Sequence, residues 1–281
     1  GEKVDGHSFI PQVAEKKAAL VICEEAPTVE IPYILVEDTF AALKEVAAFY
    51  REQLDIPFVG VTGSVGKTST KEMIAAALGA KFNVLKTQGN FNNEVGLPLT
   101  ILGIRKEHEV AVVEMGISDF GEMHRLSRIA KPNVCVITNI GQCHLENLID
   151  RDGVLKAKTE IFDFMQEDGY VVLNGDDDKL AMVKEVNGRV PYFFGLQESE
   201  KRYAFATEIQ NHGLFGSDFK MCLFGKELEA SVPLPGQHMV INALAAATVG
   251  KLLGMEEEDI LKGIASVQAT GGRSNILKLA D

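Results

Sequence analysis

Apolar runs alternate with segments of helical periodicity through most of the chain. Residues 58–63 (FVGVTG) predict a buried strand, and residues 67–78 (KTSTKEMIAAAL) predict a helix that ends at Gly79. Nearly continuous apolar runs predict further strands at 110–116, 133–140, 170–176 and 190–195. Such runs are typical of parallel strands that are covered on both faces. The alternation predicts an α/β fold with a doubly wound, mostly parallel sheet.

The pattern changes near residues 201–233, where apolar and polar positions alternate and glycines interrupt them. This stretch predicts a few short antiparallel strands. Helical periodicity returns at 238–254 and 256–267, and residues 275–281 (NILKLAD) read as the beginning of a strand.

The chain divides into three predicted parts. Residues 1–54 predict a small, partial α/β unit with two helices and two strands, and Pro57 marks its boundary with the next part. Residues 55–273 form the predicted central domain, and residues 274–281 are expected to be the start of a third domain.

Composition and charge exclude several classes of partner. Hydrophobic residues make up 46% of the 281 residues, and the net charge is −12. An acidic chain does not favour the phosphate backbone of a nucleic acid, because that needs clustered Lys and Arg. The longest mostly apolar run, 239–250, is too short to cross a bilayer, so no membrane insertion is expected. The four cysteines show no C-x-x-C spacing, which argues against a zinc site.

The segment GVTGSVGKTSTKEM at 60–73 is the clearest motif for chemistry. A strand followed by a Gly-rich turn and a helix directs backbone N–H groups and the helix dipole at one point, as in a P-loop. Gly63 and Gly66 allow close approach of phosphate, Lys67 supplies a positive charge, and the Thr68 hydroxyl can bind Mg²⁺. Gly60 stands one residue earlier than the usual P-loop spacing requires.

Glu114 ends the predicted strand VAVVE at 110–114, where a carboxylate can serve as the acidic partner of Mg²⁺. Alone, it could equally be a glutamate that begins a loop. The guanine-reading sequence Asn-Lys-x-Asp does not occur, which argues against a GTPase switch.

Lys158 lies on the apolar side of a predicted helix at 152–165. At about 100° per residue, it falls within about 60° of Val154, Ile161 and Phe162, whereas Lys156 points the opposite way. The stem could simply pack while the ammonium reaches water. The alternative is that burial lowers the pKa and leaves a neutral, nucleophilic amine.

Two polar loops follow predicted strands, where open α/β sheets place their ligand sites. The segment TNIGQCHLE at 138–146 brings Asn139 and His144 to that edge, although a single histidine is often structural or solvated. The segment GNFNNEVGLP at 89–98 is rich in asparagine, which could bind an amide or phosphate or could merely form turns.

These motifs together resemble the Mur ligases, the ATP-dependent amide-bond enzymes of peptidoglycan precursor synthesis. The loop is similar to that family's G-x-T-G-[ST]-x-G-K-T-[ST] signature, including the early glycine. Further matches are VDGHSFI, GNFNNEVGLPLTIL, EMG, RIAKPNVCVITNIGQCHLE, KAKTEIF and GQHMVINALAAA. Within the family, GNFNNEVGLPL and TNIGQCHLE favour the branch that adds D-alanyl-D-alanine. The resemblance covers nearly the whole chain and implies a central P-loop domain of the Mur ligase type.

The resemblance implies roles for particular residues. It assigns the ATP phosphates to Gly63, Ser64, Val65, Gly66, Lys67, Thr68 and Ser69. It places Thr68 and Glu114 on a first Mg²⁺, and His144 with a CO2-derived carbamate on Lys158 at a second. It implies further nucleotide contacts at Asn139, His238, Asn242 and Arg273. It implies substrate contacts at Asn90, Asn92 and Asn93. Met239 departs from the family pattern, in which Asn often follows the histidine.

The implied activity is an ADP-forming ligation. The carboxylate of a UDP-N-acetylmuramoyl-tripeptide would become an acyl phosphate, with Lys67, Lys158, His144 and Glu114 as the catalytic set, and D-alanyl-D-alanine would displace phosphate. The resemblance also implies a monomer in a bacterial cytoplasm. Because both ends resemble interior parts of family members, the chain is expected to bind nucleotide weakly without turnover. The alternatives are a sibling Mur ligase, folylpolyglutamate synthetase or a non-catalytic nucleotide-binding module.

Overall fold

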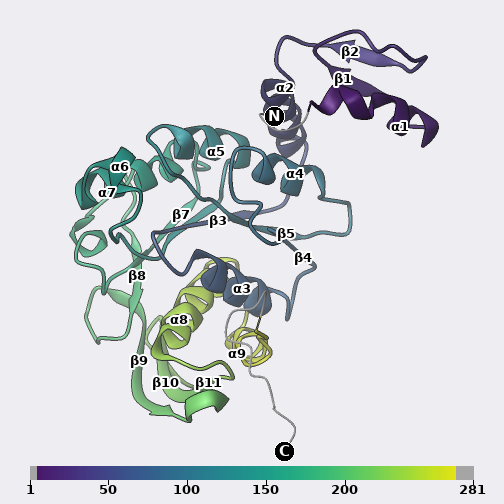
Figure 1. Cartoon of the computed structure of the whole chain (residues 1–281). Coiled ribbons are helices and arrows are strands. Elements are labelled where there is room, and N and C mark those ends of the chain that lie inside the picture. The colour runs from purple at the N-terminus through teal and green to yellow at the C-terminus, as the bar shows by residue number, and fades with distance from the viewer. Residues whose placement is uncertain (1–4, 270–281) are drawn as a thin grey trace, which may run out of the picture.

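A nine-stranded sheet forms the centre of the computed structural model, which describes residues 5–269 (Figure 1). Its strand order is β11-β10-β9-β8-β7-β6-β3-β5-β4. The strands are β3 (Phe58–Thr62), β4 (Val84–Lys86), β5 (Val110–Glu114), β6 (Val134–Ile137), β7 (Tyr170–Asn174), β8 (Tyr192–Gly195), β9 (Arg202–Asn211), β10 (Ser217–Leu223) and β11 (Lys226–Val232). The strands from β4 to β9 pair in parallel, which confirms the predicted mostly parallel sheet.

The antiparallel part continues this same sheet. Strand β10 pairs antiparallel with both β9 and β11, as the alternating pattern near 201–233 predicts. Strand β9 has ten residues, longer than the short strands expected there, and it also pairs in parallel with β8. In β10, buried residues alternate with less buried ones, because one face of the strand packs on the core and the other faces solvent.

Helices cover both faces of the sheet (Figure 1). The helices of this part are α3 (Lys67–Leu78), α4 (Gly96–Leu102), α5 (Glu122–Ala130), α6 (Leu145–Leu148), α7 (Arg151–Thr159), α8 (Gln237–Leu252) and α9 (Glu257–Ala265). Short 3-10 turns occur at η2 (Glu160–Phe162), η3 (Leu180–Met182) and η4 (Gly213–Phe215). One apolar core lies beneath α3, α8 and α9, and a second lies on the side of α4, α5 and α7. The bounds of α3 match the predicted helix, including its end at Gly79.

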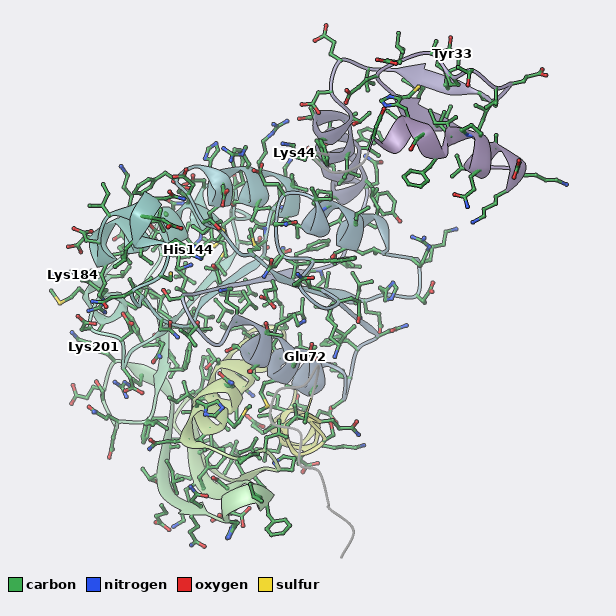
Figure 2. All side chains as sticks on the ribbon, viewed as in Figure 1. Tyr33, Lys44, Glu72, His144, Lys184 and Lys201 are labelled. Carbon is green, nitrogen blue, oxygen red and sulfur yellow. The ribbon has the colours of Figure 1, made fainter. Side chains whose placement is uncertain are left out.

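The N-terminal unit, residues 5–38, contains η1 (Gly6–Phe9), α1 (Ile10–Glu15), β1 (Val21–Cys23) and β2 (Tyr33–Leu35). It has its own small core, and its two strands pair in parallel. It stands apart from the large sheet, as the position of Tyr33 shows (Figure 2).

Helix α2 (Thr39–Glu52) leads from the N-terminal unit to the sheet. Its buried Arg51 donates to the carbonyls of Ala130 (2.7 Å) and Lys131 (3.1 Å), and Ala47 belongs to the core beside α4 and α5. The end of α2 therefore packs against the central part, just before the predicted boundary at residue 54. The predicted strand at 275–281 and the predicted third part, 274–281, lie outside the described residues.

No helix within residues 5–269 is both long enough and apolar enough to span a lipid bilayer.

Candidate active site

The Gly-rich loop lies where the sheet changes direction. Strand β3 lies between β5 and β6, so the chain runs to one side of β3 first and to the other side later. Ligands of open α/β sheets bind at the carboxyl ends of the strands at this switch point. Gly66 is the N-cap of α3 with φ +84°, and Gly63 has φ +149°. A Cβ at Gly63 would lie 1.9 Å from Thr138 Oγ1, so a side chain there would clash with the loop after β6.

Asn139 fixes the shape of this loop from outside. Its carbonyl accepts from Ser64 N–H (3.0 Å), its Oδ1 accepts from Val65 N–H (3.0 Å), and its Nδ2 donates to the Val65 carbonyl (2.8 Å). Thr138 Oγ1 donates to the same carbonyl at 2.7 Å. The contacts of Asn139 are thus with the loop itself, and contact with the nucleotide remains a prediction.

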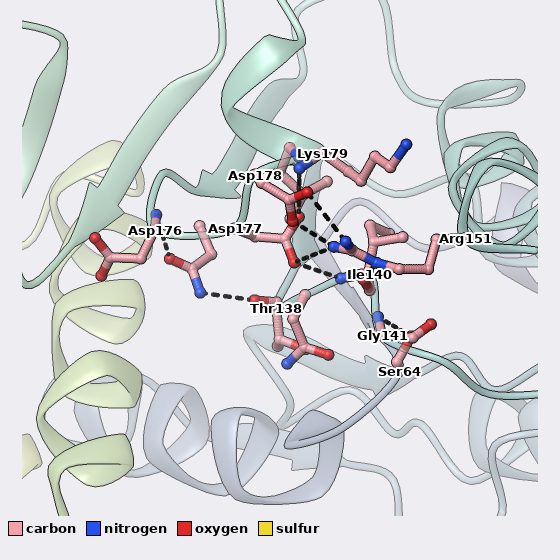
Figure 3. Close-up of polar contacts among 12 residues, drawn as sticks. Ser64, Thr138, Ile140, Gly141, Arg151, Asp176, Asp177, Asp178 and Lys179 are labelled. Carbon is pink, nitrogen blue, oxygen red and sulfur yellow. Dashed lines mark hydrogen bonds and ion pairs between the residues drawn. The ribbon is translucent and has the colours of Figure 1, made fainter.

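Further bonds tie the segment after β6 to the loop and to α7 (Figure 3). Gly141 N–H donates to Ser64 Oγ at 2.8 Å. Ile140 N–H donates to Asp177 Oδ2 at 2.8 Å, and the Ile140 carbonyl accepts from Arg151 Nε at 2.8 Å. Because Arg151 is the first residue of α7, the network links the Gly-rich loop to the helix that carries Lys158.

Lys67, Thr68 and Ser69 form the first turn of α3 and are all partly buried. Lys67 Nζ donates to the Gly63 carbonyl at 3.0 Å, so its ammonium lies over the loop. A charged donor at a helix N-terminus, beside glycine backbone, suits an anion such as phosphate.

Glu114 provides the acidic group at the end of β5. Its side chain is buried, and its Oε1 accepts from Asn92 Nδ2 at 2.8 Å. Its Oε2 is buried without a hydrogen-bond partner among the described residues, as is Thr62 Oγ1 at the end of β3. A buried carboxylate oxygen without a partner is costly, and a bound cation would satisfy it. The donor therefore fits a Mg²⁺ ion.

Residues 5–269 contain no cluster of three or more His, Cys, Asp or Glu side chains arranged to hold a metal.

Lys158 faces inward, as its helical projection predicts. Only 1% of its surface is exposed, whereas Lys156 on the same helix is exposed. Its ammonium makes no hydrogen bond or ion pair with any residue of the described part, and the side chain as a whole is packed against the core. Burial and the nearby charge of Lys67 lower the pKa of Lys158 to about 8. A larger neutral fraction at neutral pH makes this amine more nucleophilic than an ordinary lysine.

His144 is exposed and precedes α6, with a left-handed φ of +51°. It borders a cleft of about 480 Å³ at the carboxyl edge of the sheet. The cleft is lined by Lys67, Asn92, Asn93, Glu94, Val95, Gly116, Ile117, Ser118, Glu122 and His144. Three of the predicted loops therefore meet at one cavity, although they are far apart in sequence.

The three candidate asparagines differ in their contacts. Asn92 lines the cleft and binds Glu114, whereas Asn93 lines it and uses Oδ1 to accept from Gly96 N–H (2.9 Å) at the start of α4. Asn93 is thus a turn former in this structure. Asn90 is exposed and does not line the cleft described above.

The residues expected near adenine lie on α8. His238 is exposed in its first turn, and Asn242 is buried with its Oδ1 accepting from Thr70 Oγ1 at 2.8 Å. This bond joins α8 to α3. Arg273 lies outside the described residues.

A model of the Mur ligase middle domain matches residues 61–250. The chain belongs to the Mur ligase family. The matched stretch begins within β3 and ends within α8, so it contains the Gly-rich loop, Glu114, His144 and Lys158. This accords with the sequence resemblance.

Among Mur ligases, the chain is similar to proteins named UDP-N-acetylmuramoyl-tripeptide–D-alanyl-D-alanine ligase. It is 38% identical over 281 residues to the one from Bacillus subtilis (strain 168). The aligned region covers 99% of this chain and 60% of that protein. The chain therefore spans about 60% of the length of this relative.

Two solved Mur ligases are similar in structure. MurF from Acinetobacter baumannii has a TM-score of 0.91 and 35% identity, covering all of this chain and 61% of that chain. MurF ligase from Thermotoga maritima, solved in complex with ADP, has a TM-score of 0.86 and 31% identity, covering 99% of this chain and 64% of that chain.

Sequence reasoning did not identify several residues that support the site. Asp177 and Arg151 hold the segment that leads to His144, and Thr87 holds Glu114. Lys71 was also overlooked, although its spacing of four residues from Lys67 places both lysines on one side of α3.

Proposed function

We propose that this chain is the nucleotide-binding part of an ADP-forming ligase that joins D-alanyl-D-alanine to a UDP-N-acetylmuramoyl-tripeptide in peptidoglycan precursor synthesis. The observation that carries the proposal is the buried, unpartnered oxygen of Glu114 at the edge that bears Lys67 and the cleft. The names of the related proteins supply the substrates. A bacterial cytoplasm and a monomeric state belong to the same proposal.

ATP would bind with its phosphates against residues 63–69. The backbone of this loop is already shaped by Thr138 and Asn139, so little ordering is needed on binding. Lys67 would move from the Gly63 carbonyl to a phosphate oxygen, a stronger charge-assisted bond.

Two Mg²⁺ ions, when bound, would neutralise the charge that develops on the phosphoryl group during transfer. Thr68 and Glu114 would hold the first ion, which the free oxygen of Glu114 fits. His144 and a carbamate on Lys158 would hold the second. Since Lys158 has no partner and a lowered pKa, its neutral amine could add to CO2, lose a proton and leave an anionic oxygen donor.

The ligation has two steps in this proposal. The terminal carboxylate of the tripeptide attacks the γ-phosphorus of ATP, the bond to the bridging oxygen breaks, and ADP leaves. The amine of D-alanyl-D-alanine then attacks the carbonyl carbon of the acyl phosphate, loses a proton and expels phosphate. Lys67 would stabilise charge on the phosphate oxygens in the first step.

The carbamate is tested by adding ¹³C-bicarbonate and looking for a carbamate resonance by NMR. We expect a signal in the wild-type chain and in Lys156→Ala, whose lysine is on the same helix but exposed. We expect none in Lys158→Ala. A signal that survives in Lys158→Ala would contradict the assignment.

The substrates are tested by phosphate release from ATP with the UDP-tripeptide present. Release that depends on D-alanyl-D-alanine supports the proposal. Release with single amino acids favours a sibling ligase, and release with a folate and glutamate favours folylpolyglutamate synthetase. Because the chain spans about 60% of its relatives, we expect nucleotide binding without turnover in the 281-residue chain. If a longer form of the protein also binds nucleotide but ligates none of these substrates, the result favours a non-catalytic nucleotide-binding module.

A further inference from the structure

Helix α3 carries a second lysine, Lys71, that no substrate can reach. Only 1% of its surface is exposed. Its Nζ donates to the Thr87 carbonyl at 2.6 Å and lies 2.9 Å from Glu72 Oε1. A buried ammonium with two such partners is fixed in place, because losing either would leave a charge or a carbonyl unsatisfied.

Glu72, the partner of Lys71, also forms an ion pair with the end of strand β4. Its other oxygen pairs with Lys86, the last residue of β4, and Thr87 follows directly. Burial opposes the charge of the Glu72 carboxylate, but hydrogen bonds from Lys86 and Lys71 outweigh burial and lower its pKa. Helix α3, where Glu72 lies (Figure 2), thus holds the last residue of β4, Lys86, and the residue that follows it, Thr87.

Thr87 connects Lys71 to Glu114, because it is hydrogen-bonded to both residues. Its N–H donates to the Val112 carbonyl at 3.1 Å, and its Oγ1 accepts from the backbone N–H of Glu114 at 2.9 Å. Thr87 is completely buried. The backbone of Glu114 is therefore held by a threonine that is itself held by Lys71.

One end of this chain of contacts is Glu114, and the other end, Lys71, lies close to Thr68, the second proposed ligand of the Mg²⁺ ion. Lys71 lies one helical turn after Lys67 and Thr68, and Glu114 carries the free oxygen. We propose that Lys71, acting through Thr87, is a positioning residue that sets the distance between Glu114 and the phosphate-binding loop for a nucleotide-bound divalent cation. This inference rests on the proposed function, since it presumes that Glu114 binds the metal.

The test compares the dissociation constant of ADP in EDTA with that in saturating Mg²⁺, measured by calorimetry on the 281-residue chain. In the wild type, Mg²⁺ is expected to tighten ADP binding by about tenfold, within the usual range for coupled ligands. Thr87→Val keeps the shape of the side chain but removes the hydroxyl, and is expected to lose most of this gain while binding metal-free ADP as before. Lys71→Met should also reduce the gain in ADP affinity that Mg²⁺ gives. If Lys71→Met does not fold, the result for Thr87→Val alone tests the inference.

Two variants serve as controls. Thr87→Ser retains the hydroxyl and should restore the Mg²⁺ effect. Lys81→Met removes another lysine-to-carbonyl bond, from Lys81 Nζ to Gly254 at 2.8 Å, on the exposed surface away from Glu114, and should leave the effect unchanged.

An unchanged Mg²⁺ effect in Thr87→Val would overturn the inference. A loss of metal-free affinity as large as the loss with Mg²⁺ would also overturn it, because that would mark a general structural defect. If the wild type binds ADP with no Mg²⁺ effect, the metal site of the proposed function fails, and the inference falls with it.

Discussion

The two faces of the sheet each bury one lysine near the carboxyl edge, and the two lysines have opposite surroundings. Lys71, on α3, has a carbonyl and a carboxylate within hydrogen-bonding distance. Lys158, on α7, is equally buried but has no hydrogen-bond or ion-pair partner among the described residues, and its pKa is lowered to about 8. Burial alone therefore does not make a lysine reactive. A carboxylate and a carbonyl stabilise the charge of a buried lysine, whereas burial without such partners lowers the pKa, as at Lys158.

The difference matches the tasks proposed for the two residues. A lysine that fixes the spacing of a metal site needs partners that hold it still. A lysine that reacts with CO2 needs a neutral amine whose nitrogen lone pair is not engaged by another group. The following predictions test this contrast, beginning with the largest effect.

Replacing Lys71 by Met should destabilise the fold by about 4 kcal/mol, because it breaks a buried ion pair and leaves the Thr87 carbonyl unsatisfied. Chemical denaturation of the two proteins measures the difference. Lys81→Met is the matched control and should change stability far less, since that lysine is exposed. A loss for Lys71→Met no greater than that of the control would remove the contrast between the faces.

Replacing Lys158 by Met should have the opposite sign and stabilise the chain by about 3 kcal/mol at pH 7, the cost of charging an amine whose pKa has fallen from 10.5 to about 8. Between these two values the unfolded state binds more protons than the folded state. Wild-type stability therefore rises with pH through that window, and the advantage of the variant shrinks.

This difference is measured by denaturation in CO2-free buffer from pH 7 to 10.5, the ordinary pKa of the lysine. Lys156→Met, from the exposed side of the same helix, should show no such pH dependence. An advantage of Lys158→Met that is constant over the whole range would show that Lys158 titrates normally.

Replacing Glu114 by Gln should abolish the gain of about tenfold that Mg²⁺ gives to ADP binding, because a neutral amide does not replace the unpartnered carboxylate oxygen as a Mg²⁺ ligand. Calorimetry in Mg²⁺ and in EDTA gives the ratio. The double variant with Thr87→Val should lose no more than Glu114→Gln alone. Additive losses would separate Thr87 from the metal site.

Replacing Asn93 by Ala should cost only about 1 kcal/mol of stability, the usual net effect of losing the hydrogen bonds that its Oδ1 accepts from the N–H groups of Val95 and Gly96. Thermal denaturation measures this loss, with Asn90→Ala as an exposed control from the same loop. If Asn93→Ala instead leaves stability unchanged and weakens substrate binding, Asn93 is a ligand and not a turn former.

Local patterns in the sequence predicted much of the fold and part of the site. The strand, turn and helix around residues 58–78 follow from periodicity and glycine placement, and the inward direction of Lys158 follows from helix geometry. The length of β9 and its pairing with both β8 and β10 could not be predicted from the sequence, because pairing depends on which strands become neighbours. The helical projection also missed that α7 ends at Thr159 and continues as a 3-10 turn.

By itself, the sequence indicated the strand, Gly-rich turn and helix at 58–78, the strand that ends at Glu114, and the resemblance to the Mur ligases. These features depend on residues close together in the chain, whose backbone geometry is set by local sterics and periodicity. Only the tertiary structure decided which buried lysine has partners, that Asn139 shapes the loop, and that one oxygen of Glu114 is free. Those properties depend on polar atoms from distant segments, since the desolvation cost of a buried group is set by whatever folds against it.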